Sequence, residues 1–198
     1  MTHEIDNILL AKLLAPVHQE KDGAGDYLRA LNLYWIDGGS ESDLNSFKVV
    51  AARLQQHREY WVHLLRRGSW RQRIVGCTCL LVTRQAGFFR DLCPSLAYGV
   101  DWLAPQIAVT MGIVYPSDAA AFMTDFLNRK SLTDTSSKTL VSIEQVASLL
   151  GIREPSACGS ERWDDDYEVS DALIAYSVVH THWKFWTDRK VVPQWMTP

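Results

Sequence analysis

Apolar residues recur every three or four positions along most of this 198-residue sequence. In residues 43–57, for example, Leu44, Phe47, Ala51 and Leu54 would lie on one face of a helix. Short stretches of this kind follow one another, separated by residues that begin or end helices. The pattern predicts an all-α protein of roughly seven to nine short helices.

The clearest helix boundary lies in the sequence SWRQ at residues 69–72. The Ser69 hydroxyl can accept a hydrogen bond from the Gln72 amide, and the Gln72 side chain can reach back, which forms a capping box. Gly68 directly precedes it and is expected to end the preceding helix. A final helix is predicted for about residues 170–188, although the β-formers in residues 173–183 leave a strand open there.

We expect a single all-helical domain over residues 1–198. Short connections make successive helices pack antiparallel, which predicts helix pairs in a HEAT-like short α-solenoid or an irregular bundle. Residues 1–42 would hold N-terminal helices and a loop, and residues 43–151 the core of helix pairs. Residues 152–198 would hold an acidic loop and the C-terminal helix.

The sequence carries no signal for a membrane or for export. No apolar run approaches the roughly 18 residues that a transmembrane helix needs. The N-terminus has no basic region leading into an apolar core, so it does not read as a secretory signal. We therefore expect no membrane partner.

The cysteines are few and are not spaced like metal ligands. They are Cys77, Cys79, Cys93 and Cys158. Zinc sites use repeated C-x-x-C pairs, whereas residues two apart on a helix point in diverging directions. Buried and reduced cysteines are expected, which favours a cytoplasmic location and predicts neither a metal nor another cofactor.

Charge is segregated along the chain although the net charge is only −3. Residues 1–47 carry a net charge of −5, residues 48–90 of +8 and residues 91–171 of −8. The basic segment could face the phosphates of a nucleic acid, or the basic and acidic segments could pair with each other. The arginines that a nucleic acid would contact are Arg66, Arg67, Arg71 and Arg73.

Acidic residues are densest at residues 161–168, where aromatic residues lie among them. The candidate partner-binding residues are Trp163, Asp164, Asp165, Asp166, Tyr167 and Glu168. Adjacent carboxylates cannot all be buried unpaired, because desolvation of each costs several kcal/mol. They could be a solvated loop at the start of the last helix, a surface for a basic protein, or a divalent-metal site.

No stretch of the sequence matches a known catalytic signature. His57, Glu59 and His63 are the candidates for an enzyme of unfamiliar type, but a catalytic zinc needs three ligands and an open position. His180 and His182 would share a face only on a strand, and on a helix they diverge. We interpret all of these histidines as ordinary surface residues and predict no catalytic residue.

Aromatic residues crowd the C-terminal part of the sequence. They are Trp183, Phe185, Trp186 and Trp195. Core packing of the last helix would account for most of them, since aromatic side chains contribute much of a core's buried area. An exposed aromatic patch that completes an interface is the alternative.

The segment from Leu64-Leu65 to Trp70-Arg71-x-Arg73 resembles part of a bacterial all-helical family of unknown function. The shared features are a leucine pair, a short turn, W-R-x-R and an apolar helix, and the resemblance spans about residues 45–150. This family is built of HEAT-like helix pairs. In size and organisation the chain is also similar to HEAT-like immunity proteins, which neutralise toxins used between competing bacteria.

The resemblance implies a non-enzymatic protein-binding module with a cognate toxin as the partner. The acidic residues at 161–168 favour a basic surface on that partner. An immunity protein of this kind would occlude the toxin's active site or substrate surface. The alternatives are a helical protein that binds nucleic acid through residues 48–90 and an enzyme of unrecognised type.

Overall fold

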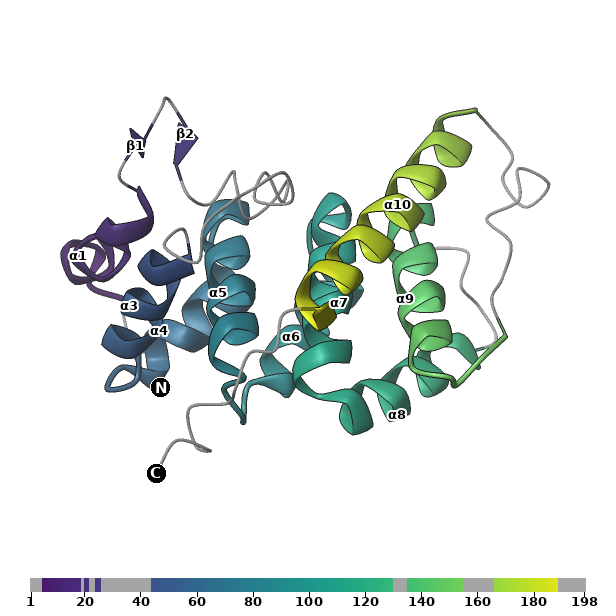
Figure 1. The fold of residues 1–198 in the computed structure, drawn as a ribbon, viewed down its shortest axis with the longest axis horizontal. Helices are drawn as coiled ribbons and strands as arrows, with labels where there is room; N and C mark the ends of the chain where they lie inside the picture. The colour runs from purple at the N-terminus through teal and green to yellow at the C-terminus, as the bar shows by residue number, and fades with distance from the viewer. Residues whose placement is uncertain are drawn as a thin grey trace. The chain divides into compact units, whose positions relative to one another are not determined.

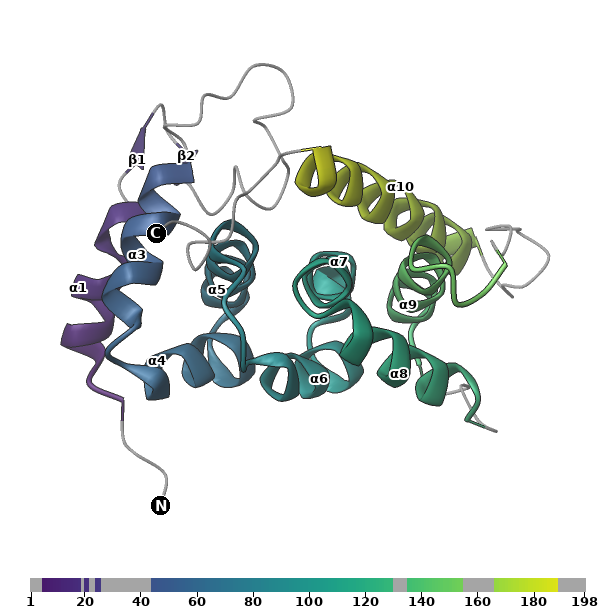
Figure 2. The ribbon, with the colours of Figure 1, turned by 60° about the horizontal axis from the view of Figure 1, so that its bottom comes forward.

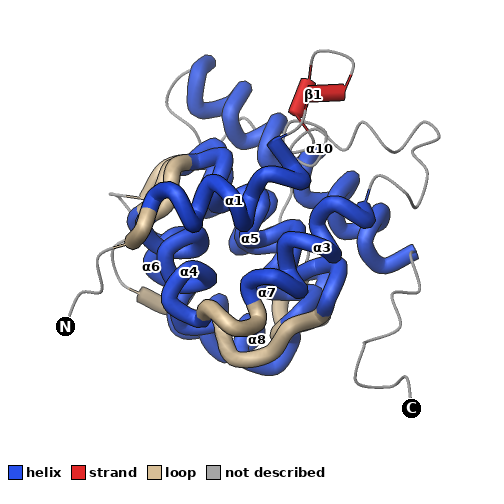
Figure 3. The backbone as a smooth tube through the Cα atoms, turned by 90° about the vertical axis from the view of Figure 1, so that its left-hand side faces the viewer, coloured by secondary structure: helices blue, strands red, loops and turns tan. Residues whose placement is uncertain are grey.

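The computed structural model describes residues 5–18, 20–21, 24–25, 44–129, 135–154 and 166–188. Within these ranges the fold is all-α, as the sequence predicts (Figure 3). The strands in these ranges, β1 (Glu20–Lys21) and β2 (Ala24–Gly25), form one short antiparallel pair. Residues 173–183 lie in a helix, so the alternative of a strand there is wrong.

The helices follow one another along the chain, and those between residues 45 and 127 have short connections (Figure 1). They are α1 (Asn7–His18), α3 (Asn45–Leu54), α4 (Arg58–Val62), the π-helix η2 (His63–Arg67), α5 (Trp70–Thr83), α6 (Phe89–Tyr98), the 3-10 helix η3 (Asp101–Leu103), α7 (Ala104–Val114), α8 (Pro116–Leu127), α9 (Ser137–Leu149) and α10 (Asp166–Asp188). The described residues fall into two compact units, divided between Gln85 and Ala86. The single domain and the HEAT-like repeat stay predictions.

In the first unit, α3 packs against both α1 and α5. Helix α1 begins where the Asp6 carboxylate accepts hydrogen bonds from the amides of Ile8 and Leu9, at 2.8 and 3.1 Å. Along α3 the predicted apolar stripe is buried. Helix α5 is buried along residues 74–83 on every side, which explains why its thiols are buried although they diverge.

The predicted capping box is present at the start of α5. The Ser69 amide donates to Gln72 Oε1 at 2.8 Å, and the Gln72 amide donates to Ser69 Oγ at 3.4 Å. Gly68 does end the preceding helix, but its backbone is extended. A Cβ atom on Gly68 would lie 2.8 Å from Gln72 Cβ, so a close approach requires the glycine.

In the second unit, α7 and α9 lie side by side and form the middle layer (Figure 2). Helices α6 and α8 cover one side of this layer, and α10 lies across the other side. Because they are covered from both sides, α7 is buried from Ala104 to Gly112 and α9 is buried from Ser137 to Ala147, apart from half-buried Lys138.

Both ends of α9 are closed by local hydrogen bonds. The Ser136 hydroxyl accepts from the Thr139 amide at 3.3 Å, which caps the N-terminus. At the C-terminus Gly151 adopts a φ of 72°, and the Ile152 amide donates to the Ala147 carbonyl at 2.9 Å. This six-to-one bond is that of a Schellman motif, which ends the helix at the glycine.

Three helices of the second unit meet at Gly112 of α7. A Cβ atom there would lie 2.6 Å from Val146 Cγ1 on α9 and 2.7 Å from Trp183 Cζ3 on α10. Both distances are too short for a real contact. The glycine therefore sets how closely α7, α9 and α10 approach one another.

We expect Gly112→Ala to lower the free energy of unfolding by about 1–2 kcal/mol. Overpacking of a core costs about 1–3 kcal/mol, and the better helix propensity of alanine returns up to about 1 kcal/mol. Urea unfolding followed by circular dichroism would measure the change. Ser177→Ala, on an exposed position of α10, is the control and should stay within about 0.5 kcal/mol of the original chain. A Gly112→Ala protein as stable as this control would contradict the packing.

Candidate partner-binding surface

Helix α10 presents one buried face and one exposed face. Ala172, Ala175, Val179 and Trp186 are buried, and the helix packs on α7 and α9. The opposite side of the helix is exposed. We define the outer face of α10 as Asp166, Tyr167, Ser170, Leu173, Ile174, Ser177, Thr181 and Lys184, all of which are exposed.

The predicted partner-binding residues lie partly on this outer face. Asp166 and Tyr167 are exposed in the first turn of α10, whereas Glu168 is half-buried. The helix begins at Asp166, four residues earlier than predicted, and acidic groups suit the positive end of a helix dipole. Trp163, Asp164 and Asp165 lie outside the described residues.

The apolar part of the outer face is not among the residues that the sequence predicts for partner binding. Tyr167 is 73% exposed, Leu173 52% and Ile174 49%, and Tyr176 at the border of the face is 39% exposed. Large apolar side chains gathered on one helix are unusual on a free surface. The feature of the sequence that could have indicated this apolar part is the pair of small residues Ala172 and Ala175. Because these two are buried, Leu173 and Ile174 lie on the outward side of the helix.

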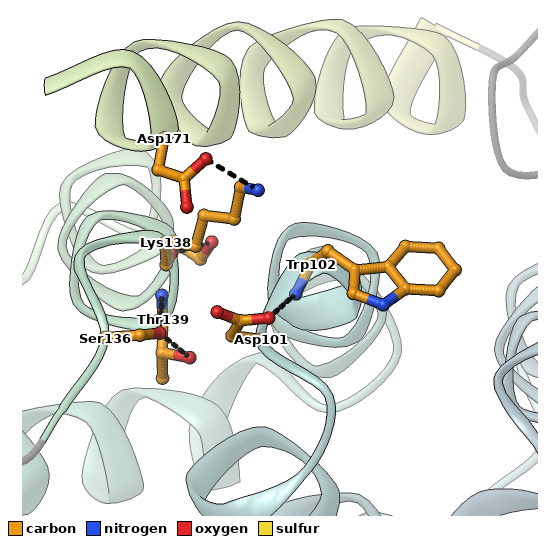
Figure 4. A network of polar contacts seen from close by, with 7 residues as sticks. Asp101, Trp102, Ser136, Lys138, Thr139 and Asp171 are labelled. Atoms are coloured by element: carbon orange, nitrogen blue, oxygen red, sulfur yellow. Dashed lines mark hydrogen bonds and ion pairs between the residues drawn. The ribbon is translucent and has the colours of Figure 1, made fainter. Parts of the chain in front are cut away.

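An ion pair fixes the N-terminal part of α10 to α9 (Figure 4). Lys138 Nζ lies 2.8 Å from Asp171 Oδ1, and the two side chains are only 15% and 10% exposed. Asp171 follows the acidic cluster in the sequence, yet it is buried and paired inside the second unit. It is therefore not part of the exposed acidic surface.

Further polar contacts surround this pair. Ser136 Oγ donates to Thr139 Oγ1 at 3.1 Å in the first turn of α9, beside Lys138 (Figure 4). The Asp101 carboxylate of η3 accepts from the Trp102 amide at 2.7 Å, and η3 packs against α9. Among these contacts, the Lys138–Asp171 ion pair is the one that joins the first turn of α9 to α10.

The middle of α9 also uses polar contacts. The buried Glu144 carboxylate lies 3.7 Å from Arg153 Nη1, and Gln145 Oε1 lies 3.2 Å from His180 Nε2 of α10. His180 and His182 diverge on the helix as expected, but His182 is buried. The interpretation of His182 as a surface residue is therefore wrong.

The aromatic residues of α10 mainly serve packing. Trp186 is buried, and Trp183 is half-buried against Gly112. Phe185 is half-buried and meets Trp186 edge-on, with 4.9 Å between ring centroids. Trp195 lies outside the described residues. Core packing is the role that these three described side chains have.

The four predicted arginines gather at the junction of η2 and α5, in the first unit. Arg73 Nη2 donates to the Arg66 carbonyl at 3.3 Å, and the Arg71 guanidinium lies 5.0 Å from the centroid of the Trp70 ring. Arg66, Arg67 and Arg71 are exposed, and Arg73 is half-buried. The W-R-x-R motif thus places Arg71 over the Trp70 ring and bonds Arg73 to the backbone of η2.

The residues considered for an enzyme lie near this junction. His57 Nδ1 lies 3.5 Å from the Glu59 carboxylate. Burial, helped by the charge of Arg67, lowers the pKa of His63. A lowered pKa keeps this imidazole neutral at neutral pH.

The described part of the chain offers no metal site, since no three His, Cys, Asp or Glu side chains gather there. Cys77, Cys79 and Cys93 are free thiols, and Cys158 lies outside the described residues. Cys79 is buried, its Sγ donates to the Phe47 carbonyl at 3.4 Å, and burial raises its pKa. Such a thiol is a packing residue and not a nucleophile.

No protein-family model matches the chain, and neither does any curated protein or solved structure. Among the described helices, none combines the length and the apolar character that crossing a membrane requires. The resemblance to a HEAT-like family therefore stays a prediction, and the geometry of the described residues carries the functional argument.

We expect Asp171→Leu and Lys138→Met each to lower the free energy of unfolding by about 2–4 kcal/mol. Each leaves a largely buried charge without its opposite, which costs more than the intact pair contributes. The double variant Lys138→Met/Asp171→Leu removes both charges and should recover most of this loss. A double-mutant cycle from urea unfolding measures the coupling. Additive losses in the double variant would contradict the coupling.

Proposed function

We propose that the chain is a non-enzymatic binding module that holds a protein partner on the outer face of α10. The single observation that carries the proposal is the set of exposed apolar side chains on this face, Tyr167, Leu173 and Ile174. Interfaces draw their binding energy from a few such anchors, which lose water when the partner covers them.

The charges beside these anchors support a basic partner. Asp166 is exposed in the first turn of α10, and Asp164 and Asp165 directly precede it in the sequence. Acidic groups at the rim of an apolar patch attract a positively charged protein and speed its association. The buried pair Lys138–Asp171 holds this end of α10 in place, so the surface is formed before a partner arrives.

The partner that the family resemblance implies is a toxin, which the module would neutralise by occlusion. A toxin that acts on nucleic acid or on membranes needs a basic surface, and the acidic end of α10 would compete for it. The free thiols Cys77, Cys79 and Cys93 support a reducing compartment, so we place the protein in the cytoplasm.

A tagged capture from the native cell tests this function. The full chain should retain one stoichiometric protein, and Leu173→Ser/Ile174→Ser should weaken its binding by at least about 2 kcal/mol, through the lost burial of two large side chains. Titration of the identified partner by calorimetry would give this difference.

Two further variants make the experiment specific. Val49→Ser changes an exposed apolar residue on α3 of the first unit, and it should leave the partner bound. The triple variant Asp164, Asp165, Asp166→Asn should slow association and flatten its dependence on salt. Capture that is equal for Leu173→Ser/Ile174→Ser and for Val49→Ser would reject the outer face of α10 as the binding surface.

A second candidate function is binding of nucleic acid at the η2–α5 junction. The observation that favours it is the exposure of Arg66, Arg67 and Arg71 within one short stretch of the first unit. Clustered arginines on an exposed surface can neutralise successive phosphates.

For this candidate, the logarithm of the affinity for duplex DNA or RNA should fall linearly with the logarithm of salt concentration. Arg67→Ala should reduce the slope by about one if that residue contacts a phosphate. Fluorescence anisotropy with labelled duplexes measures both quantities, and Arg129→Ala, an exposed arginine of the second unit, is the matched control. Absence of binding at low salt would dismiss the candidate.

A further inference from the structure

Helix α4 and the π-helix η2 form one continuous helical segment, residues 58–67, whose burial repeats every four residues. Residues 60–61 and 64–65 are buried, and residues 58–59 and 66–67 are exposed. An α-helix turns by about 100° per residue, so it would rotate a four-residue repeat by about 40° at every step. A wider turn is what keeps such a repeat on one side of the segment.

The π-helix supplies this wider turn. The Gly68 amide donates to the His63 carbonyl at 2.7 Å, five residues back and not four, so each residue of η2 contributes less rotation than in an α-helix. With α-helical geometry throughout, Arg66 would lie about 80° around the axis from Arg58, because eight residues turn by about 800°. The wider turn reduces this angle. It brings Arg66 toward the side of the segment on which Arg58 lies.

Arginines outnumber acidic residues along this exposed side. The sequence of residues 58–71 has one acidic residue, Glu59, whose carboxylate lies 3.5 Å from His57 Nδ1 at the N-terminal end of the segment. The hydrogen bond from Arg73 Nη2 to the Arg66 carbonyl, at 3.3 Å, keeps the first turn of α5 beside η2. We define the arginine ridge as four exposed residues, Arg58, Arg66, Arg67 and Arg71.

The length of the arginine ridge suits an extended polyanion. Arg58 and Arg66 lie about 12 Å apart along the segment, since each of eight residues adds about 1.5 Å. Two exposed arginines at this separation on one helix do not converge on a single phosphate group. Duplex DNA carries a charge for about every 1.7 Å of its axis. The major groove of B-DNA admits an α-helix, whereas that of duplex RNA is too deep and narrow, so duplex DNA is the ligand that fits.

We propose that the arginine ridge binds the phosphate backbone of duplex DNA, and that η2 aligns the ridge for this contact. The inference rests on the second candidate function, the binding of nucleic acid at the η2–α5 junction. It adds Arg58 to the site, names the ligand and gives the π-helix a role. Contacts to phosphates carry no information on the bases, so the binding is independent of DNA sequence.

Fluorescence anisotropy of the purified full chain with labelled duplex DNA tests the proposal. Four phosphate contacts predict a slope of about −3.6 for the logarithm of the affinity against the logarithm of salt concentration. Arg58→Gln should bring this slope about one unit closer to zero and lower the affinity by about tenfold at 50 mM salt. Two duplexes of unrelated sequence should bind equally. Arg58 is exposed, so circular dichroism should show the same helical fold in the variant.

Two further variants separate the alignment of the ridge from the net charge. Arg58→Gln/Ala11→Arg restores the net charge at an exposed position of α1, and it should bind as weakly as Arg58→Gln. Gly68→Ala keeps every arginine but shifts the end of η2, because the new Cβ atom would lie 2.8 Å from Gln72 Cβ and 3.0 Å from the Leu64 carbonyl oxygen. It should also reduce the slope, at a temperature where circular dichroism shows the protein folded.

Several outcomes would overturn the proposal. They are an unchanged slope for Arg58→Gln or for Gly68→Ala, full binding by the charge-restored double variant, and equally tight binding of duplex RNA or of polyglutamate. If Arg67→Ala lowers the slope and Arg58→Gln does not, this inference fails while the second candidate function stands. Absence of DNA binding at low salt rejects both. Capture of a protein on the outer face of α10 is independent of all these results.

Discussion

The second unit depends on how the polar residues of α9 are satisfied inside the protein. This helix is buried along nearly its whole length, yet Ser142, Glu144 and Gln145 lie in its middle. A buried polar group without a partner costs free energy comparable to a lost hydrogen bond or more. Ser142 donates to the Lys138 carbonyl at 2.6 Å, but the longer side chains need partners from other segments. The position of α10 follows from this requirement.

Two contacts determine which side of α10 faces inward. Asp171 meets Lys138 at the start of α9, and His180 meets Gln145 further along. These two residues of α10 lie nine positions apart, so together they fix both the rotation and the slide of the helix. With this side turned inward, Tyr167, Leu173 and Ile174 are turned outward. These three apolar residues are therefore exposed because of how the buried polar residues pair. The inner side of the helix carries apolar residues as well.

The sequence predicts those features that depend on neighbouring residues. The capping box of Ser69 and Gln72, the helix end at Gly68 and the stripe along α3 each involve groups a few residues apart, and all are present. The burial of Asp171 could not be predicted in this way, because its partner Lys138 is 33 positions away. A carboxylate near an acidic cluster is predicted to be exposed as long as its distant partner is not known.

The same limit applied to the candidate site. The exposed Asp166 and Tyr167 could be predicted from their local composition, whereas Leu173 and Ile174 read as core residues in a helix with several apolar positions. The packing of α10 on α7 and α9, together with its buried polar pairs, decides which of its apolar residues are buried. Small side chains, Ala172 and Ala175, occupy the buried positions and cluster with Val141 of α9.

The two candidate surfaces, the outer face of α10 and the η2–α5 junction, differ in how much of their binding capacity is already used within the chain. At the η2–α5 junction, Arg73 is bonded to the Arg66 carbonyl, and Arg71 lies on the Trp70 ring. These contacts order the two arginines. They also use part of each guanidinium's capacity to bind other groups within the chain itself. The apolar side chains on the outer face of α10 are exposed by 49–73%, so their burial remains to be gained. Because burial of apolar area contributes more to stable association than exposed charge does, α10 is the stronger surface for a lasting complex.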